Sequence, residues 1–178
     1  MEIRLRPLTL KDLNKTFQWH NDEEIKRLYS SHPFPVSIEN EKLWYKKILT
    51  SNIPVTVFGI ESILTKELIG IASLKDINLI NRSAEFGMYV GAKKLRGHGI
   101  SIAVTKLILE YAFLKLGLNR VYSHMIEDNM PAWKLCERIG FKREGKLRQS
   151  LFRNGKFYNE LIYSILRTEY YGGSLLVE

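Results

Sequence analysis

The chain has 178 residues, of which 45% are hydrophobic and 26% are charged, and this balance is typical of a globular domain with its own apolar core. A domain of this length buries roughly 70% of the surface that its unfolded chain exposes, so neither disulfides nor a metal are needed for folding. The formal charge of +8 and the pI near 9.5 favour an anionic partner, but they do not choose among nucleic acid, a membrane surface and a phosphate-bearing ligand.

The single cysteine and the N-terminal residues bear on the cellular compartment in which the protein is expected. A lone cysteine, Cys136, cannot form an intramolecular disulfide, and no Cys/His cluster has the spacing of a zinc site, so we expect a reducing environment and no metal. The N-terminal sequence MEIRLRP alternates charged and apolar residues and lacks the long apolar run of a signal peptide or a membrane span. These features predict a cytoplasmic protein with no membrane partner.

Basic residues are scattered along the chain rather than gathered in a block. Their densest group is Lys93, Lys94 and Arg96. Because a nucleic-acid-binding arm would concentrate such charges, a nucleic-acid partner is the disfavoured interpretation. No internal repeat, low-complexity tract or Gly/Ser linker divides the chain, so we expect a single domain over residues 1–178.

The first third of the sequence predicts one strand followed by two helices. A strand over 3–6 comes first, and Thr9 can then cap a helix that runs to about His20. Ser37 is the expected cap of a second helix over 38–49. The apolar face of the first helix is formed by Leu10, Leu13 and Phe17.

The middle of the sequence changes from helical to alternating periodicity and back. Three short β-rich runs, 55–60, 68–74 and 84–90, are separated by polar turns and predict an antiparallel meander. From Gly99 the pattern is helical again as far as about Gly117. The apolar stripe of this helix is formed by Ile100, Ala103, Val104, Leu107, Ile108 and Tyr111.

The last third predicts a strand, a short helix and a hairpin. A buried strand over 120–126 precedes Asn129, which can cap a helix over 131–138 that Gly140 ends. The closing hairpin is formed by strands over 147–152 and 156–166 around the turn Asn154-Gly155. The complete order of elements is that of a mixed α/β domain.

The segment from Met88 to Ser101 carries the clearest chemical signal, because a strand passes through a basic, glycine-rich loop into the N-terminus of a helix. Glycines let the backbone approach a ligand closely, and the first N–H groups of a helix together with its dipole attract anions. The loop lacks the signatures of a P-loop and of a dinucleotide fold, so ATP and NAD are poor candidates, whereas a pyrophosphate fits. A tight turn that uses Gly for positive φ is the competing interpretation.

Two motifs in this half of the chain resemble those of the GNAT acetyltransferase superfamily. The run 96–101, Arg-Gly-His-Gly-Ile-Ser, resembles the family's Arg/Gln-x-x-Gly-x-Gly/Ala acetyl-CoA motif, although Ser101 stands where Gly or Ala is usual. The run 129–141, which begins with Asn129 and ends with Gly-Phe, is similar to the second signature, Asn-x-x-Ala-x-x-x-Tyr-x-x-x-Gly-Phe. The runs 82–86 and 152–158 further resemble the branch that holds spermidine and ribosomal-protein acetyltransferases.

The resemblance implies a single α/β (α+β) GNAT-like domain, with a mixed, largely antiparallel sheet flanked by helices. Its central strands, 85–90 and 120–126, would be splayed to admit the pantetheine arm of acetyl-CoA. Backbone groups of Met88, Tyr89 and Val90 would hold this arm, and one N–H would polarise the thioester carbonyl. The other residues that the resemblance assigns to the cofactor are Arg96, Gly97, His98, Gly99, Ile100, Ser101 and Asn129.

The implied reaction is direct attack of a primary amine on the acetyl thioester, with no covalent enzyme intermediate. Cys136 stands where many relatives carry the tyrosine that protonates the departing thiolate, and it acts either as that acid or as a small buried hydrophobe. Glu85 is the first candidate for the general base, against an exposed strand residue paired with a Lys or Arg. His124, on the opposing strand, is a second candidate, although alternation along the strand can turn it away from the cleft.

The acceptor stays open among a polyamine, a nucleotide-linked amino sugar and a protein N-terminal amine. Four glutamates in the region that relatives use to shape the acceptor site either attract a polyamine or are ordinary solvated charges: Glu23, Glu24, Glu39 and Glu41. Two interpretations from other classes compete with the enzyme, namely a catalytically silent acyl-CoA-binding module and a basic RNA- or ribosome-binding domain. Exposed edge strands near the closing hairpin permit a homodimer.

Overall fold

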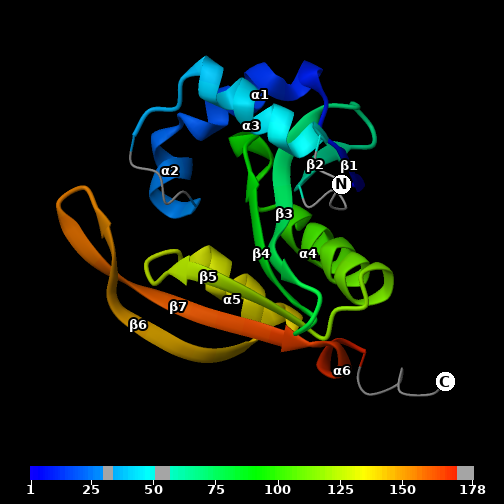
Figure 1. Ribbon diagram of the computed structural model, residues 1–178, viewed down its shortest axis with the longest axis vertical. Helices are drawn as coiled ribbons and strands as arrows, with labels where there is room; N and C mark the ends of the chain where they lie inside the picture. Colours follow the sequence, from blue (N-terminus) through cyan, green and yellow to red (C-terminus); the bar gives the residue numbers. More distant parts are fainter. Residues whose placement is uncertain (30–33, 51–56, 172–178) are drawn as a thin grey trace. The chain divides into compact units, whose positions relative to one another are not determined.

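The computed structural model describes residues 1–29, 34–50 and 57–171, and within them seven strands form one sheet in the order β1-β2-β3-β4-β5-β7-β6 (Figure 1). The strands are β1 (Ile3–Pro7), β2 (Val57–Ser62), β3 (Leu68–Asn78), β4 (Ser83–Val90), β5 (Arg120–Ile126), β6 (Lys142–Arg153) and β7 (Lys156–Leu166). The α-helices are α1 (Leu13–His20), α2 (Glu23–Tyr29), α3 (Ile38–Thr50), α4 (Ile100–Glu110), α5 (Met130–Ile139) and α6 (Arg167–Tyr170). Short 3-10 turns cover Leu10–Asp12 and Lys93–Leu95, and a π-helical stretch covers Tyr111–Lys115.

The chain divides into two compact units, which are described separately. The N-terminal unit comprises Met1–Ser73 and Met88–Val104. The C-terminal unit comprises Leu74–Gly87 and the chain from Thr105 onward. Strands β3 and β4 and helix α4 each contribute residues to both units.

The N-terminal unit packs α1, α2 and α3 around the antiparallel strands β1, β2 and β3. Its buried apolar cluster joins the helices to β3 through Leu8, Trp19, Ile25, Tyr45, Leu68 and Ile71. Gly91, directly after β4, is a glycine because a Cβ there would overlap the ring of Trp19. This close approach places the end of β4 against the C-terminal half of α1.

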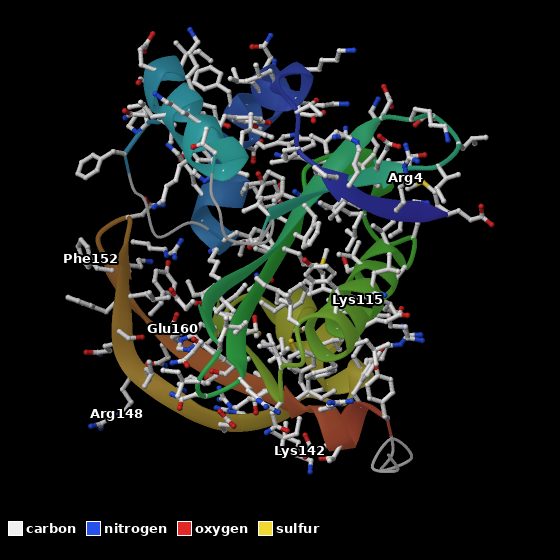
Figure 2. The ribbon with its side chains drawn as sticks, turned by 45° about the vertical axis from the view of Figure 1, so that its right-hand side comes forward. Arg4, Lys115, Lys142, Arg148, Phe152 and Glu160 are labelled. Atoms are coloured by element: carbon white, nitrogen blue, oxygen red, sulfur yellow. The ribbon has the colours of Figure 1, made fainter. Side chains whose placement is uncertain are left out.

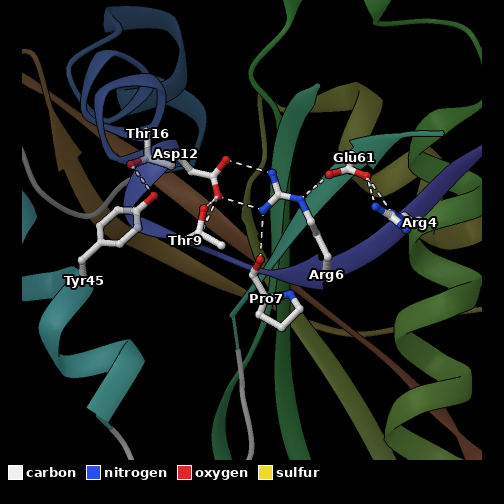
Figure 3. A network of polar contacts seen from close by, with 8 residues as sticks. All are labelled: Arg4, Arg6, Pro7, Thr9, Asp12, Thr16, Tyr45 and Glu61. Carbon is white, nitrogen blue, oxygen red and sulfur yellow. Dashed lines mark hydrogen bonds and ion pairs between the residues drawn. The ribbon is translucent and has the colours of Figure 1, made fainter. Parts of the chain in front are cut away.

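A charged network ties β1 to the turn before α1 and to β2 (Figure 3). The Arg6 guanidinium donates to both carboxylate oxygens of Asp12 at 2.8 Å and through Nε to Glu61 at 2.5 Å. Arg4 donates to the other Glu61 oxygen at 2.7 Å, and the Thr9 N–H donates to Asp12 at 2.8 Å. Both carboxylates are buried, so each loses water contacts that these donors replace.

The C-terminal unit is built on β5 and the long β6–β7 hairpin. Strand β4 runs parallel to β5, and among the described residues their ladder is limited to three pairs, from Ser83↔Arg120 to Glu85↔Tyr122. Strand β7 pairs antiparallel with both β5 and β6, and β6 and β7 run side by side as long curved strands (Figure 1). The hairpin turns at Asn154 (φ 49) and Gly155 (φ 78), the two left-handed positions of a type I′ turn.

Most of the predicted elements are confirmed, and the differences have local causes. The first α-helix begins at Leu13 rather than after Thr9, because Leu10–Asp12 forms a 3-10 turn, and Leu10 is therefore 68% exposed instead of lying on the apolar face. Helix α2 was not predicted, and β6 begins at Lys142, five residues before the predicted strand. The predicted start of β2 at 55–56 lies outside the described residues.

Asn129 corrects the expected cap of α5. The helix begins after it and Gly140 ends the helix in a left-handed conformation (φ 105), as predicted. The Asn129 side chain, however, makes no capping hydrogen bond. Pro131 in the first turn removes one N–H that a cap would otherwise serve, so the helix start depends less on a side-chain acceptor.

Replacing Asp12 by Asn should lower the free energy of unfolding by about 2 kcal/mol at pH 7, because the Arg6 guanidinium loses its charged acceptor. Burial by itself would raise the pKa of Asp12, but hydrogen bonds from Arg6 and Thr9 outweigh it and lower the pKa. A carboxyl with a depressed folded-state pKa stabilises the fold above its unfolded pKa of about 3.9, and this contribution is lost as the pH falls through the folded value. The difference between wild type and D12N should therefore shrink below pH 4.

Urea unfolding at pH 7 and at pH 3 measures both effects. Asp128→Asn removes an exposed carboxylate that has no ion pair with any described residue, and it should change stability by no more than about 0.5 kcal/mol. Equal stability of D12N and wild type at pH 7 would show that the network adds nothing to the fold.

Candidate active site

The loop between β4 and α4 exposes its backbone. Gly97 (φ 84) and Gly99 (φ 76) are both left-handed, and a Cβ added at either would meet no described atom within 4 Å. The intrahelical bonds of α4 begin when Ile102 donates to the Gly99 carbonyl at 3.1 Å. The backbone just ahead of this bond forms a helix N-terminus that faces open space, which is the arrangement that binds phosphate groups.

Four charged side chains fix this loop, and we call them the loop clamp: Asp22, Glu24, Lys93 and Arg96. Arg96 Nε donates to the Val90 carbonyl at 2.9 Å and Nη1 donates to Glu24 at 2.7 Å. Lys93 Nζ lies 2.8 Å from Asp22 and 3.1 Å from Glu24. Lys93 hydrogen bonds lower the pKa of both carboxyls, and Asp22 and Glu24 raise the pKa of Lys93. The remaining nitrogen of Arg96, Nη2, is buried and has no hydrogen-bond partner among the described residues.

The other predicted loop residues differ in what they can offer a ligand. The exposed His98 ring folds back, with Nδ1 3.0 Å from the Arg96 carbonyl oxygen. Ile100 is buried, so its contribution is limited to the backbone, and Ser101 is half-buried in the first turn of α4. The loop therefore offers a ligand mainly its main chain and the loop clamp.

The end of β4 carries an aromatic side chain into the N-terminal unit. The Tyr89 ring lies 6.1 Å from Trp19, 6.2 Å from His20 and 6.1 Å from Tyr29, measured between ring centroids. Its hydroxyl is buried without a hydrogen-bond partner in the described part of the chain, and burial, followed by the charge of Glu41, raises its pKa well above the usual value. Buried tyrosine hydroxyls normally have a partner, so this group is open to one.

A histidine–carboxylate pair in the same unit was missed by the sequence analysis. Glu41 on α3 is only 1% exposed, so the interpretation of this residue as a solvated charge is wrong. Its Oε2 lies 2.8 Å from Nδ1 of His20, and its Oε1 accepts from the Thr16 hydroxyl at 2.5 Å. The spacing of these residues could have indicated the pair. Thr16 and His20 are four residues apart and lie on one face of α1, and Glu41 and Tyr45 lie in the same way on one face of α3.

The C-terminal unit holds both candidates for the general base that the sequence named. Glu85 is half-buried on β4 opposite Tyr122, and within the described residues its side chain makes no hydrogen bond or ion pair. Its charge contributes, after burial, to the raised pKa of Tyr122. His124 is exposed, and its Nδ1 lies 3.7 Å from Glu160, too far for a hydrogen bond.

Asn129 and Cys136 also lie in the C-terminal unit. Asn129 is 1% exposed, yet neither its amide nitrogen nor its amide oxygen has a hydrogen-bond partner among the residues described. Cys136 is a free thiol, 5% exposed on α5, and burial followed by the charge of Glu137 raises its pKa to about 12. The Tyr163 hydroxyl donates to Glu137 at 2.9 Å, which fixes that carboxylate beside the thiol.

The described residues contain neither a metal site nor a membrane-spanning helix. No group of three or more His, Cys, Asp or Glu side chains in ranges 1–29, 34–50 and 57–171 is placed to hold a metal ion. In the same ranges, no helix combines the length and the apolar character needed to cross a membrane.

Comparison with known proteins places this geometry in a family. Residues 2–142 match the model of the acetyltransferase (GNAT) domain. The spermidine N(1)-acetyltransferase of Vibrio cholerae is 32% identical over 169 residues, covering 95% of each chain. The Bacillus subtilis protein YdaF, which is named as a ribosomal N-acetyltransferase, is 39% identical over 116 residues, or 64% of this chain and 63% of that one.

A solved structure extends the likeness to the three-dimensional fold. Spermidine N-acetyltransferase from Vibrio cholerae, in complex with CoA and spermine, superimposes with a TM-score of 0.86 at 31% identity, covering 95% of this chain and 98% of that one. The open, mostly antiparallel sheet with its flanking helices is the fold predicted from the two motifs. The chain belongs to the GNAT acetyltransferase family, and it is an N-acetyltransferase that uses acetyl-CoA as cosubstrate.

Proposed function

We propose that this enzyme acetylates an acceptor that carries a single primary amine, and that residues 1–178 act as one catalytic domain in the cytoplasm. The observation that carries the acetyl-CoA assignment is the junction of β4, the loop and α4, where two left-handed glycines leave the backbone open beside basic side chains. A pyrophosphate is the group that such a junction binds.

The residues proposed for the cofactor fit it in each unit. In the N-terminal unit, the backbone of 88–90 would hold the pantetheine arm and the loop 96–101 the pyrophosphate, with the unpartnered Arg96 Nη2 available to an anionic oxygen. In the C-terminal unit, the buried amide of Asn129 has both a donor and an acceptor that no described residue uses. Buried polar groups of this kind are rare without a partner, which supports a contact with the bound cosubstrate.

Acetyl-CoA supplies a thioester whose carbonyl carbon is the electrophile. The acceptor ammonium must first lose a proton, and the free amine nitrogen then forms a bond to that carbon as the C–S bond breaks and CoA leaves as a thiolate. The acylated nitrogen releases its second proton to solvent, which leaves the neutral amide. Glu85 is the candidate base that the sequence names, and its half-buried carboxylate is unpaired within the described ranges. Cys136 is the candidate acid for the thiolate, against a packing role for the same side chain.

The thiol of Cys136 is poorly suited to the role of acid. Its pKa of about 12 lies above the value of about 8.5 for an ordinary thiol, so a proton transfer from Cys136 to the CoA thiolate would be uphill. The thiol is also buried on α5. These observations support the packing role, and the thiolate would then take its proton from water.

The charge pairing in the N-terminal unit supports an acceptor with one amine. Of the four glutamates that could attract a polycation, Glu24 is paired with Lys93 and Arg96, Glu41 with His20, and Glu23 lies 3.8 Å from Lys26. The fourth, Glu39, is exposed and has no ion pair with a described residue. A polyamine would have to compete with the existing partners of the first three. A nucleotide-linked amino sugar or a protein N-terminal amine needs no such displacement, whereas the names of the spermidine N-acetyltransferases keep a polyamine as the rival class.

The outer strand of the hairpin supports a homodimer. Strand β6 is at the edge of the sheet and most of its side chains are exposed, which leaves a ladder that another strand can extend. Figure 2 shows Arg148 pointing away from β6 and Phe152 beside the hairpin turn. We propose that neither a membrane nor a nucleic acid is a partner of the enzyme.

Thiol release from acetyl-CoA should be observed with one acceptor class in a panel of polyamines, nucleotide-linked amino sugars and peptides with free N-termini. We expect turnover with a single-amine class, because the glutamates paired in the described structure are not free to hold a polycation. Preference for spermidine over both other classes would overturn the acceptor proposal. Binding of acetyl-CoA without any turnover would indicate a silent binding module, and RNA binding without acetyl-CoA affinity would indicate the third class.

Arg96→Ala should raise the KM for acetyl-CoA about 10-fold or more, because the loop loses its bonds to Val90 and Glu24 together with one cation. Lys94→Ala is the matched control, since it removes the same charge from an exposed side chain that has no ion pair in the described ranges. Steady-state kinetics on both variants make the comparison. Equal effects of the two changes would mean that only net charge matters at the loop.

Cys136→Ala separates the acid from the packing role. If the thiol only packs, kcat should change by no more than a few-fold and the free energy of unfolding should fall by about 1 kcal/mol or less, because one small buried group is removed. A loss of kcat of about 100-fold with unchanged stability would support Cys136 as the general acid. The kcat measurement and a thermal unfolding curve decide between the two.

A further inference from the structure

We propose that His20, oriented by the buried carboxylate of Glu41, is the general base that removes the proton from the acceptor ammonium. The inference rests on the proposed function, since it assigns a step of the same reaction. It places the base in the N-terminal unit and takes this role from Glu85.

The pair has the geometry that activates a histidine. His20 ends α1, and its Nδ1 lies 2.8 Å from Glu41 Oε2 on α3. An ionised carboxylate can only accept, so Nδ1 carries the hydrogen and, in the neutral ring, the lone pair is left on Nε2. Glu41 is itself fixed, because the Thr16 hydroxyl donates to its other oxygen at 2.5 Å. A carboxylate held in this way sets the tautomer of the imidazole and stabilises the imidazolium that forms when Nε2 takes a proton.

The reactive side of the ring is available. The His20 side chain is 24% exposed, and within residues 1–29, 34–50 and 57–171 Nε2 has no hydrogen-bond partner. His98 donates Nδ1 to backbone carbonyls, and His124 is 3.7 Å from the carboxylate of Glu160. Among the described histidines, His20 alone combines a hydrogen-bonded carboxylate with an unused ring nitrogen.

The ring also lies beside the segment proposed to hold the acetyl group. Tyr89, in the middle of that segment, packs edge to face with His20 at a centroid distance of 6.2 Å. On another side, Trp44 lies 5.0 Å away with its ring nearly perpendicular. These rings limit the rotation of His20, which favours a fixed base over a mobile one. All of these groups belong to the N-terminal unit.

The proton balance of the step is simple. Nε2 takes one proton from the R–NH3⁺ group, which leaves R–NH2 and an imidazolium, and the positive charge lies against the Glu41 carboxylate. The titratable groups that the described contacts bring near the pair are Glu41 and Tyr45 from α3 and Tyr89 from β4. Both tyrosines have a raised pKa, mainly through burial.

The competing interpretation is purely structural. In that case the pair only joins α1 to α3, and a substitution would lower activity by the same factor at every pH. A general base behaves differently, because its loss matters only while the acceptor is protonated. A peptide α-amine titrates near pH 8, so with that acceptor the defect should disappear as the pH rises above about 8.

The experiment compares wild type, His20→Gln, Glu41→Gln and Glu85→Gln over pH 6 to 10, using a peptide with a free N-terminus and a nucleotide-linked amino sugar as probes. We expect H20Q to lower kcat/KM about 100-fold at pH 6.5, with the loss shrinking to a few-fold once the pH exceeds the pKa of the probe's amine. E41Q should show a smaller loss with the same pH recovery. Gln18→Ala, an exposed change on the same helix, should leave the profile unchanged.

The Kd for acetyl-CoA and the thermal midpoint of each variant separate chemistry from folding. A pH-independent loss in H20Q, or a pH-recoverable loss in E85Q but not in H20Q, would overturn the assignment of His20 while wild-type turnover keeps the proposed function intact. Absence of wild-type turnover with every acceptor would overturn both.

Discussion

One guanidinium, that of Arg96, holds the end of β4, the glycine-rich loop and the start of α2 together. Its Nε donates to the carbonyl of Val90, the last residue of β4, and its Nη1 donates to Glu24 on α2. The loop needs these bonds, because two left-handed glycines without side-chain contacts give the backbone a freedom that binding would have to remove. By fixing the loop through side chains at its ends, the protein keeps residues 97–99 exposed and ordered, which would lower the entropic cost of binding an anion at the proposed site.

In this chain, whose net charge is +8, the buried carboxylates of the N-terminal unit have hydrogen-bond partners. Each buried carboxylate described in the N-terminal unit is matched: Asp12 and Glu61 by Arg6 and Arg4, and Glu41 by His20 and Thr16. The arginines in this set hold a permanent charge, whereas His20 can gain or lose its proton. The Glu41–His20 pair can therefore take up a proton, which the arginine network cannot do. The Glu41 carboxylate stabilises the His20 ring when the ring binds that proton. Buried ion pairs are by themselves weak evidence for stability.

The sequence predicted the elements whose patterns are local and left out those that depend on tertiary contacts. The Asn154-Gly155 turn, the Gly140 helix end and the glycine turn before α4 were confirmed, because each depends on backbone conformations that few residues adopt. Helix α2 was not predicted because its seven residues are too few to show a clear helical pattern. The burial of Glu41 was not predicted because a glutamate in a helix is usually solvated. Its burial depends on Thr16 and His20, which are distant in sequence. The roles of Glu85 and Cys136 could not be derived from a motif, since neither position matches a residue type that has one function only.

Some buried polar side-chain atoms have no hydrogen-bond partner in the described part of the chain, and most of them belong to residues that the sequence motifs include. Among the described residues, five buried side-chain atoms lack a hydrogen-bond partner, and they belong to Tyr89, Arg96, Asn129 and Tyr171. The lack of a partner is not sufficient evidence of a site, because Tyr171 is the last described residue and no motif includes it. The family resemblance assigns Arg96 and Asn129 to acetyl-CoA, whereas it assigns Tyr89 through its backbone only. A buried amide or guanidinium nitrogen without a partner costs about 1 to 3 kcal/mol, so a fold retains it where an external group completes the bond. Agreement between the two motifs and the unpartnered atoms of Arg96 and Asn129 supports the proposal that these residues contact acetyl-CoA.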